Sequence, residues 1–228
     1  MPTLLQDEAV HVLDLGDDEN RFTPSWIATV TELLDTVARG SEAAALVTTG
    51  RGKFFSNGLD LGWVLANSDQ APAYLRDVQV LLARLLTLPV PTIAAVNGHA
   101  FGAGAILAIA HDFRIMRSDR GYLCFPEVDI NVPFTPGMAA LIQAKLTPAA
   151  AIAAMTTGRR FDAPTAVEFG LVDRAAEESA LLATATAAVR PLAGKDRGTL
   201  GSIKSTMFAG VAATLRAAAL SLPADLES

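Results

Sequence analysis

The sequence predicts an α/β core followed by a helical C-terminal region. In the first two-thirds of the chain, short apolar runs alternate with segments of helical period, and after Pro136 the pattern is mainly helical and alanine-rich. With 51% hydrophobic and 18% charged residues, the 228-residue chain can bury a sizeable core. We place the α/β core at residues 1–170 and the helical region at residues 171–228.

The sequence of residues 9–48 predicts a strand, a helix and a second strand. Residues 9–15 alternate loosely around valines and leucines, as in a strand. A helical pattern begins at Pro24, with Thr23 as its N-cap and Gly40 as its stop. Residues 45–48 form a short apolar run that indicates a buried strand.

Proline and glycine divide the next part of the chain. Pro89 and Pro91 end a helix that begins near residue 72. We then expect a strand at residues 92–96, a turn at 98–101, a helix at 102–110 and a strand at 113–116. From Pro136 onward we expect helices only, with breaks near Gly158, Gly170 and Gly194.

The composition excludes several classes of protein. The net charge of −6 argues against nucleic acid and anionic membranes as partners. A single cysteine, Cys124, leaves no disulfide framework, and its apolar neighbours indicate a buried side chain. The three histidines lack metal-ligand spacing, so we expect no metal site. The first residues do not resemble a signal peptide, and we expect a cytoplasmic protein.

Residues 92–110 carry no charge and could suggest a membrane span. Asn97, His99 and three glycines interrupt this stretch, which divides into a strand, a turn and a helix. We therefore interpret it as buried core.

Two glycine-containing turns carry the strongest chemical signal. Each runs from an apolar strand into a helix, and each leaves a backbone N–H near the helix start, at Leu59 and at Ala103. Two such donors converging on one carbonyl oxygen would form an oxyanion hole. The small residues 102–104 would let a ligand approach the backbone closely. Either turn alone is also consistent with an ordinary strand-to-helix connection.

The pair of turns, in this order and spacing, resembles the crotonase (enoyl-CoA hydratase/isomerase) superfamily. The resemblance covers most of the chain, from the first predicted strand through residues 159–164 (RRFDAP) and 170–173 (GLVD). In that family the two oxyanion amides match Leu59 and Ala103. The resemblance also implies a spiral of ββα units, with a helical C-terminal region that mediates assembly into a homotrimer or a dimer of trimers.

The acid/base residues distinguish the reactions of this family. Its hydratases generally carry two glutamates; one position is Ile106 here, and the other is Glu127. A lone carboxylate suits a proton shift, in which Glu127 removes a proton from C2 of a 3-enoyl thioester and returns it to C4. The apolar neighbours Phe125, Val128 and Ile130 could raise the pKa of Glu127 by desolvation.

Three motifs are similar to those of plant-type Δ3,Δ2-enoyl-CoA isomerases: residues 55–61 (FSNGLDL), 111–117 (HDFRIMR) and 127–130 (EVDI). The sequence departs from many family members at Ala103 and Asn131, where glycine is common. Alanine keeps its backbone donor, and asparagine tolerates positive φ. The C-terminal region also ends early for the family, so we expect a shortened trimerisation region.

The resemblance implies an acyl-CoA substrate and no separate cofactor, because coenzyme A is part of that substrate. Arg21 and Lys204 could meet its phosphates, Asp129 is the rival base, and Asp60 is expected as a helix-start charge. The full set of predicted substrate-binding residues is Arg21, Phe22, Ser56, Gly58, Asp60, Gly102, Ile106 and Lys204. A hydratase, another crotonase reaction and a non-catalytic acyl-CoA-binding protein remain as alternatives.

Overall fold

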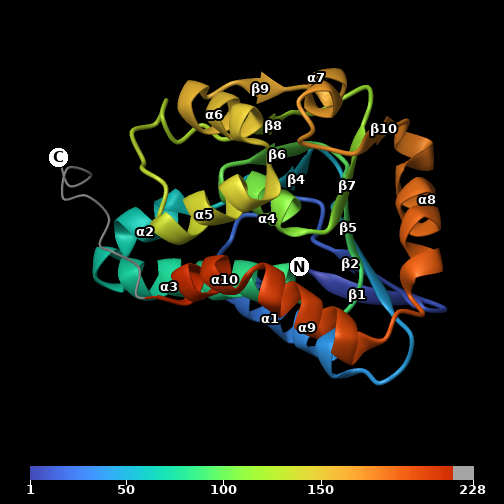
Figure 1. Cartoon of the computed structure of the whole chain (residues 1–228). Helices are drawn as coiled ribbons and strands as arrows, with labels where there is room; N and C mark the ends of the chain where they lie inside the picture. The colour runs from blue at the N-terminus through green and yellow to red at the C-terminus, as the bar shows by residue number, and fades with distance from the viewer. Residues whose placement is uncertain (218–228) are drawn as a thin grey trace.

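The computed structural model describes residues 1–217 of the chain and has two β-sheets with helices around and between them. The predicted α/β core with a helical C-terminal region is confirmed (Figure 1). Residues 218–228 of the predicted helical region lie outside the described residues. The division at residue 170 stays a prediction.

The main sheet has six strands in the order β1-β2-β3-β5-β7-β10. Its members are β1 (Thr3–Asp7), β2 (Val10–Asp14), β3 (Ala45–Thr49), β5 (Thr92–Val96), β7 (Phe113–Arg117) and β10 (Arg174–Ala176). Only the β1–β2 pair is antiparallel within this sheet; the other four pairs are parallel. The parallel strands β3 and β5 are buried on both faces, which explains their continuous apolar sequence.

The small sheet has four short strands in the order β4-β6-β8-β9. They are β4 (Phe54–Ser56), β6 (His99–Phe101), β8 (Leu123–Cys124) and β9 (Arg160–Phe161). The first three are parallel, so the carboxyl ends of β4 and β6 lie at the same edge. Both glycine turns of the sequence begin at that edge.

The helices are α1 (Pro24–Arg39), α2 (Leu61–Ala66), α3 (Ala71–Leu86), α4 (Ala103–Ala110), α5 (Pro136–Lys145), α6 (Pro148–Thr157), α7 (Ala163–Glu168), α8 (Glu178–Val189), α9 (Arg197–Met207) and α10 (Ala209–Arg216), with 3₁₀ turns at Ser68–Gln70 and Arg190–Leu192. As predicted, the Thr23 side chain caps α1 by accepting the Trp26 N–H. All eight residues of α4 are buried. Figure 1 shows α4 in the centre of the molecule and α8 along the main sheet.

The structure corrects several predicted elements. The prediction of helices only after Pro136 is wrong, because β9 pairs with β8 and β10 extends the main sheet beside β7. The predicted turn at 98–101 is partly strand β6, and strand β1 was not expected. Strands of two or three residues are too short to show a period of two, so their pairing depends on tertiary neighbours.

Residues 92–110 divide into β5, β6 and α4, which confirms their interpretation as buried core. No helix within residues 1–217 combines the length and apolar character that crossing a membrane requires.

Candidate active site

The two glycine turns lie against each other because β4 and β6 are neighbours in the small sheet. A Cβ atom added to Gly58, whose φ is +74°, would lie 2.7 Å from Phe101 O and 2.9 Å from Ala103 N. A Cβ added to Gly104 would lie 2.3 Å from Ser56 O. Both positions therefore require glycine, since any side chain would separate the turns.

Hydrogen bonds to the neighbouring peptide groups orient the Leu59 amide. Gly58 O accepts the Phe22 N–H at 2.9 Å, and in a trans peptide the Leu59 N–H then points the opposite way. The next amide, of Asp60, donates to the Tyr74 hydroxyl at 3.0 Å. The Leu59 N–H itself has no hydrogen-bond acceptor within residues 1–217. It is therefore available to a ligand.

The Ala103 amide begins helix α4. Gly102 precedes it with φ 52° and ψ −124°, a conformation that favours glycine. Within the described chain the Ala103 N–H also has no acceptor, and it lies at the positive end of the α4 dipole. Because Gly58 borders Ala103 N, the amide that follows Gly58 and the Ala103 amide belong to one small region, as an oxyanion hole requires.

Glu127 is the carboxylate beside these turns. The Gly102 N–H donates to Cys124 O at 3.0 Å, which ties the second turn to the strand that leads to Glu127. Glu127 Oε1 lies 3.5 Å from the position that a Gly102 Cβ would occupy. The residue is 9% exposed, and its buried Oε2 has no hydrogen-bond partner in the described part of the chain.

Burial raises the pKa of Glu127 from 4.5 to about 7. The sequence analysis attributed this effect to Phe125, Val128 and Ile130, and that prediction is wrong for two of these residues. Val128 and Ile130 are 49% and 45% exposed, whereas Phe125 is fully buried. The chain turns back at Pro126 instead of continuing as a strand, so alternate residues do not share a buried face.

Asp129, the rival base, lies elsewhere. Its N–H donates to Pro126 O at 2.9 Å, so the segment is a tight turn and the carboxylates of Asp129 and Glu127 diverge. Asp129 is exposed and packs against Gly158, where an added Cβ would overlap its carboxylate. Asn131 ends this turn with φ 56°, the left-handed conformation that the sequence indicated it could adopt.

Arg21 and Phe22 lie next to the first turn. Arg21 Nε donates to Glu19 Oε2 at 2.5 Å, and its Nη1 reaches Leu59 O at 3.4 Å. The Arg21 side chain is 37% exposed, so it remains open to a ligand. Phe22 is fully buried and stacks on Trp26 with ring centroids 4.5 Å apart. Its side chain is therefore core, and only its backbone supports the site.

Ser56 and Asp60 shape the first turn through local hydrogen bonds. The buried Ser56 hydroxyl donates to Asn20 O at 2.8 Å and accepts the Gly58 N–H at 3.1 Å. Asp60 caps α2 by accepting the Trp63 N–H at 3.1 Å, as the sequence predicted for a helix-start charge. Neither side chain is placed to act as a base.

Ile106 and Lys204 were both predicted to bind substrate, but only Ile106 lies on an element that begins at the glycine turns. Ile106 is fully buried on α4, the helix that begins at the second turn. Lys204 is also buried, but its Nζ donates to Asp112 Oδ2 at 2.5 Å and to Val90 O at 2.8 Å. The structure does not bring Lys204 to the glycine turns. Its expected contact with coenzyme A phosphates is replaced by a structural ion pair.

Sequence reasoning missed two residues that hold the first turn. Asn20 has φ 48° and is 1% exposed; its amide donates to Phe55 O at 3.0 Å and to Gly16 O at 3.3 Å. Tyr74 of α3 accepts the Asp60 N–H, and its pKa is raised mainly by burial. Neither has a local signal, because Asn20 sits in a polar loop and Tyr74 occupies an ordinary apolar helix position.

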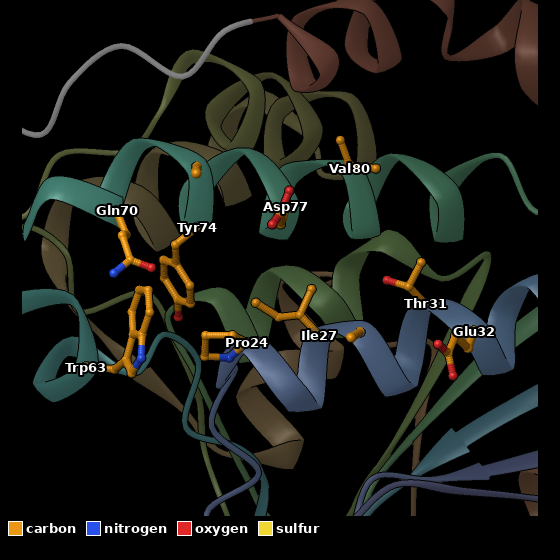
Figure 2. Close-up of a pocket in the computed structure, with 11 residues that line it drawn as sticks. Pro24, Ile27, Thr31, Glu32, Trp63, Gln70, Tyr74, Asp77 and Val80 are labelled. Atoms are coloured by element: carbon orange, nitrogen blue, oxygen red, sulfur yellow. The ribbon is translucent and has the colours of Figure 1, made fainter. Parts of the chain in front are cut away.

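A pocket of about 440 Å³ lies between α1, α2 and α3 (Figure 2). Trp63 and Tyr74, whose ring centroids are 5.2 Å apart, lie at one end near Pro24. Thr31 and Glu32 lie toward the other end. Because Tyr74 also binds the Asp60 amide, the pocket borders the first turn.

The described residues contain no cluster of three or more histidine, cysteine or carboxylate side chains suited to a metal ion. The chemistry that this arrangement supports is proton transfer by one desolvated carboxylate, next to two backbone donors.

Comparisons with known proteins identify the family. The family described as enoyl-CoA hydratase/isomerase matches residues 6–226. Among curated relatives, enoyl-CoA delta isomerase 3 of Arabidopsis thaliana is 42% identical over 171 residues, which are 72% of each chain. The peroxisomal enoyl-CoA delta isomerase 2 of the same plant is 43% identical over 172 residues, again 72% of each chain.

Solved structures of proteins with similar names have the same fold as this chain. A probable enoyl-CoA hydratase from Mycobacterium tuberculosis H37Rv superimposes with a TM-score of 0.88 at 26% identity, covering 95% of this chain and 92% of the other. An enoyl-CoA hydratase/isomerase family protein from Pseudomonas syringae gives a TM-score of 0.89 at 25% identity, covering 95% and 94%. The chain therefore belongs to the enoyl-CoA hydratase/isomerase family.

Proposed function

We propose that this protein is a Δ3,Δ2-enoyl-CoA isomerase, which moves the double bond of a 3-enoyl-CoA to the 2,3 position. One observation carries the proposal: Glu127 is a buried, unpaired carboxylate next to the second turn, while the other family position for an acid is the buried Ile106. The names of the two Arabidopsis relatives support the same activity.

In the proposed mechanism, the thioester oxygen accepts hydrogen bonds from the Leu59 and Ala103 amides. The ionised Glu127 takes a proton from C2, and the electron pair moves onto the carbonyl oxygen as an enolate. The same carboxylic acid then gives its proton to C4 as the enolate collapses, so that the double bond lies between C2 and C3. No water is consumed, and Glu127 ends in its starting state.

The environment of Glu127 suits this double role. A pKa of about 7 leaves part of the enzyme ionised near neutral pH, while the carboxylate is far more basic than an exposed one. The buried Oε2 has no partner to stabilise the negative charge within residues 1–217, which favours proton uptake.

The remaining features of the proposal follow the family. Coenzyme A enters as part of the substrate, Arg21 is the candidate for contact with its phosphates, and no cofactor is added. We infer assembly as a homotrimer or a dimer of trimers through the C-terminal helices, and a cytoplasmic location. The acidic net charge supports the absence of nucleic-acid and membrane partners.

A side-by-side assay tests the isomerase against its two alternatives. The purified protein is given 3-enoyl-CoA and, separately, 2-enoyl-CoA. We expect formation of the conjugated 2-enoyl thioester from the first substrate, with hydration of the second slower by at least about 100-fold, because one acid/base group is missing. Fast loss of the conjugated absorbance with 3-hydroxyacyl-CoA as product would instead establish a hydratase. Binding of acyl-CoA without either reaction would establish a non-catalytic binding protein.

A further inference from the structure

The Leu59 amide lies between two peptide groups that the fold holds in different ways. The carbonyl of the peptide before it, Gly58 O, accepts the Phe22 N–H at 2.9 Å, which is a contact between two backbones. In the peptide after it, the Asp60 N–H donates to the Tyr74 hydroxyl at 3.0 Å. That second contact depends on a single side chain from helix α3.

The first turn needs this second contact because its own residues cannot replace it. Gly58 has φ +74° and carries no side chain, so the peptide that presents the Leu59 N–H is free to rotate unless its neighbours are held. The Asp60 N–H precedes helix α2 and has no carbonyl of that helix to bind. The Asp60 carboxylate is already occupied by the Trp63 N–H, at 3.1 Å.

The Tyr74 side chain is itself held firmly. It is 3% exposed, and its ring lies 5.2 Å from that of Trp63 between centroids. Figure 2 shows the Tyr74 ring reaching from α3 toward Trp63 and Pro24. Burial raises the pKa of Tyr74, so its hydroxyl stays neutral across the working range of pH. The hydroxyl therefore offers a fixed, uncharged acceptor to the Asp60 N–H.

The two amides of the candidate oxyanion hole thus differ in what directs them. The Ala103 amide belongs to the first turn of α4, where the Ile106 N–H donates to Gly102 O at 3.0 Å. The regular backbone of a buried helix fixes that donor. The Leu59 amide lies outside any helix, and its following peptide is tied down by Tyr74. A donor to an oxyanion must be aimed at the place where the charge develops, so the direction of the Leu59 N–H bears on the rate.

We propose that Tyr74 is a positioning residue for the oxyanion hole. By binding the Asp60 N–H, its hydroxyl directs the neighbouring Leu59 N–H toward the substrate oxygen. Tyr74 acts through the backbone and not on the reacting atoms. The inference rests on the oxyanion hole of the proposed function, and it extends the site from the glycine turns to helix α3.

Steady-state kinetics with 3-enoyl-CoA provides the first test. Tyr74→Phe removes the hydroxyl and keeps the ring. We expect kcat to fall about 10-fold and KM to stay within about 3-fold, because a misdirected donor weakens the transition state more than the bound substrate. The control Tyr122→Phe makes the same change at the other tyrosine of the chain, which is 38% exposed, and should keep wild-type kinetics. Melting curves show that each variant is folded.

Binding of acetoacetyl-CoA provides the second test, because its enolate has a near-ultraviolet absorbance that the keto form lacks. In the wild-type protein the hole should lower the pKa of the bound ligand. In Tyr74→Phe that ligand pKa should be higher by about one unit, which corresponds to an enolate held about 10-fold less strongly. The affinity for a saturated acyl-CoA, which forms no enolate, should stay within about 3-fold. A residue that only stabilises the fold would leave the ligand pKa unchanged.

Three outcomes would overturn the inference while leaving the proposed function intact. The first is a Tyr74→Phe protein with wild-type kcat and the wild-type pKa of bound acetoacetyl-CoA. The second is a loss confined to KM. The third is a new midpoint in the pH profile of kcat/KM for Tyr74→Phe, which would make Tyr74 an acid/base group. A wild-type protein that does not bind acetoacetyl-CoA as an enolate would instead refute the oxyanion hole, and with it both proposals.

Discussion

Two buried charged groups, Glu127 and Lys204, have opposite environments. They are similarly hidden, with exposed fractions of 9% and 5%. Lys204 Nζ donates to Asp112 Oδ2 at 2.5 Å and to Val90 O at 2.8 Å. Glu127 Oε2 has no partner within residues 1–217. The charge of Lys204 is therefore compensated by a neighbouring carboxylate, and a charge on Glu127 is not.

The Lys204 ion pair belongs to a satisfied network. Asp112 Oδ2 also accepts the Thr92 N–H at 2.8 Å, and the Asp112 N–H donates to Thr92 Oγ1 at 2.9 Å. The network fastens α9 to the ends of strands β5 and β7. Burial lowers the pKa of Lys204, but the neighbouring Asp112 carboxylate opposes this shift and stabilises the cation. Among the described residues no opposite charge acts on Glu127, and burial raises its pKa to about 7. This difference indicates that Lys204 stabilises the fold, whereas Glu127 is suited to transfer a proton.

Glu127→Gln is expected to have the largest effect. The amide keeps the size of the side chain but cannot accept and return a proton, so turnover of 3-enoyl-CoA should fall by roughly 10²- to 10⁴-fold. The matched control Asp129→Asn removes a carboxylate two residues away and should leave turnover within a few-fold. Steady-state kinetics on both variants decides the matter. A strong loss of turnover in Asp129→Asn with only a mild loss in Glu127→Gln would show that Asp129, and not Glu127, is the base.

Lys204→Met should act on stability instead of chemistry. Removing the buried cation leaves the Asp112 carboxylate, whose side chain is 19% exposed, without its partner. Breaking a buried pair typically costs about 3–5 kcal/mol of unfolding free energy, and the partial exposure of Asp112 places the expected loss at the lower end. Turnover per folded molecule should change little, because Lys204 does not lie at the glycine turns. Urea unfolding and kinetics on the same preparation measure both effects. The second change in Lys204→Met/Asp112→Asn should recover part of the lost stability, and no recovery would contradict the comparison.

A change of pH should have a smaller effect than either substitution, and it should act on activity and stability in opposite directions. The base form of Glu127 is needed, so kcat/KM should rise with pH and level off above about pH 7. The folded pKa is raised from 4.5, so the stability from protonated Glu127 is complete below pH 4.5 and is lost as the pH rises through 7. The shift corresponds to roughly 3 kcal/mol.

The Glu127→Gln variant provides the reference for that measurement. Its unfolding free energy minus that of wild type should grow between pH 4.5 and pH 7 and then stay constant. A difference that is flat over this range would show that burial of Glu127 does not raise its pKa.

The sequence by itself determined the fold class and predicted the residues of a candidate site. Apolar periodicity and the Thr23 cap predicted the strand and helix order of the first half, because these signals act within one or two turns of chain. The small residues 102–104 marked a place where a ligand could approach the backbone, and the pair of turns indicated the amides of Leu59 and Ala103. Glu127 was indicated by the resemblance to the family. The caps and turns are readable from the sequence because each depends on local geometry.

Tertiary structure alone decided the strands β9 and β10, the role of Lys204 and the cause of the raised pKa of Glu127. A strand of two residues exists only because a neighbour pairs with it, and Lys204 is structural only because Asp112 lies 92 positions away in sequence and next to it in space. Val128 and Ile130 follow Glu127 closely, yet the turn at Pro126 directs them to solvent. Burial and pairing are properties of the whole fold, and no single segment carries them.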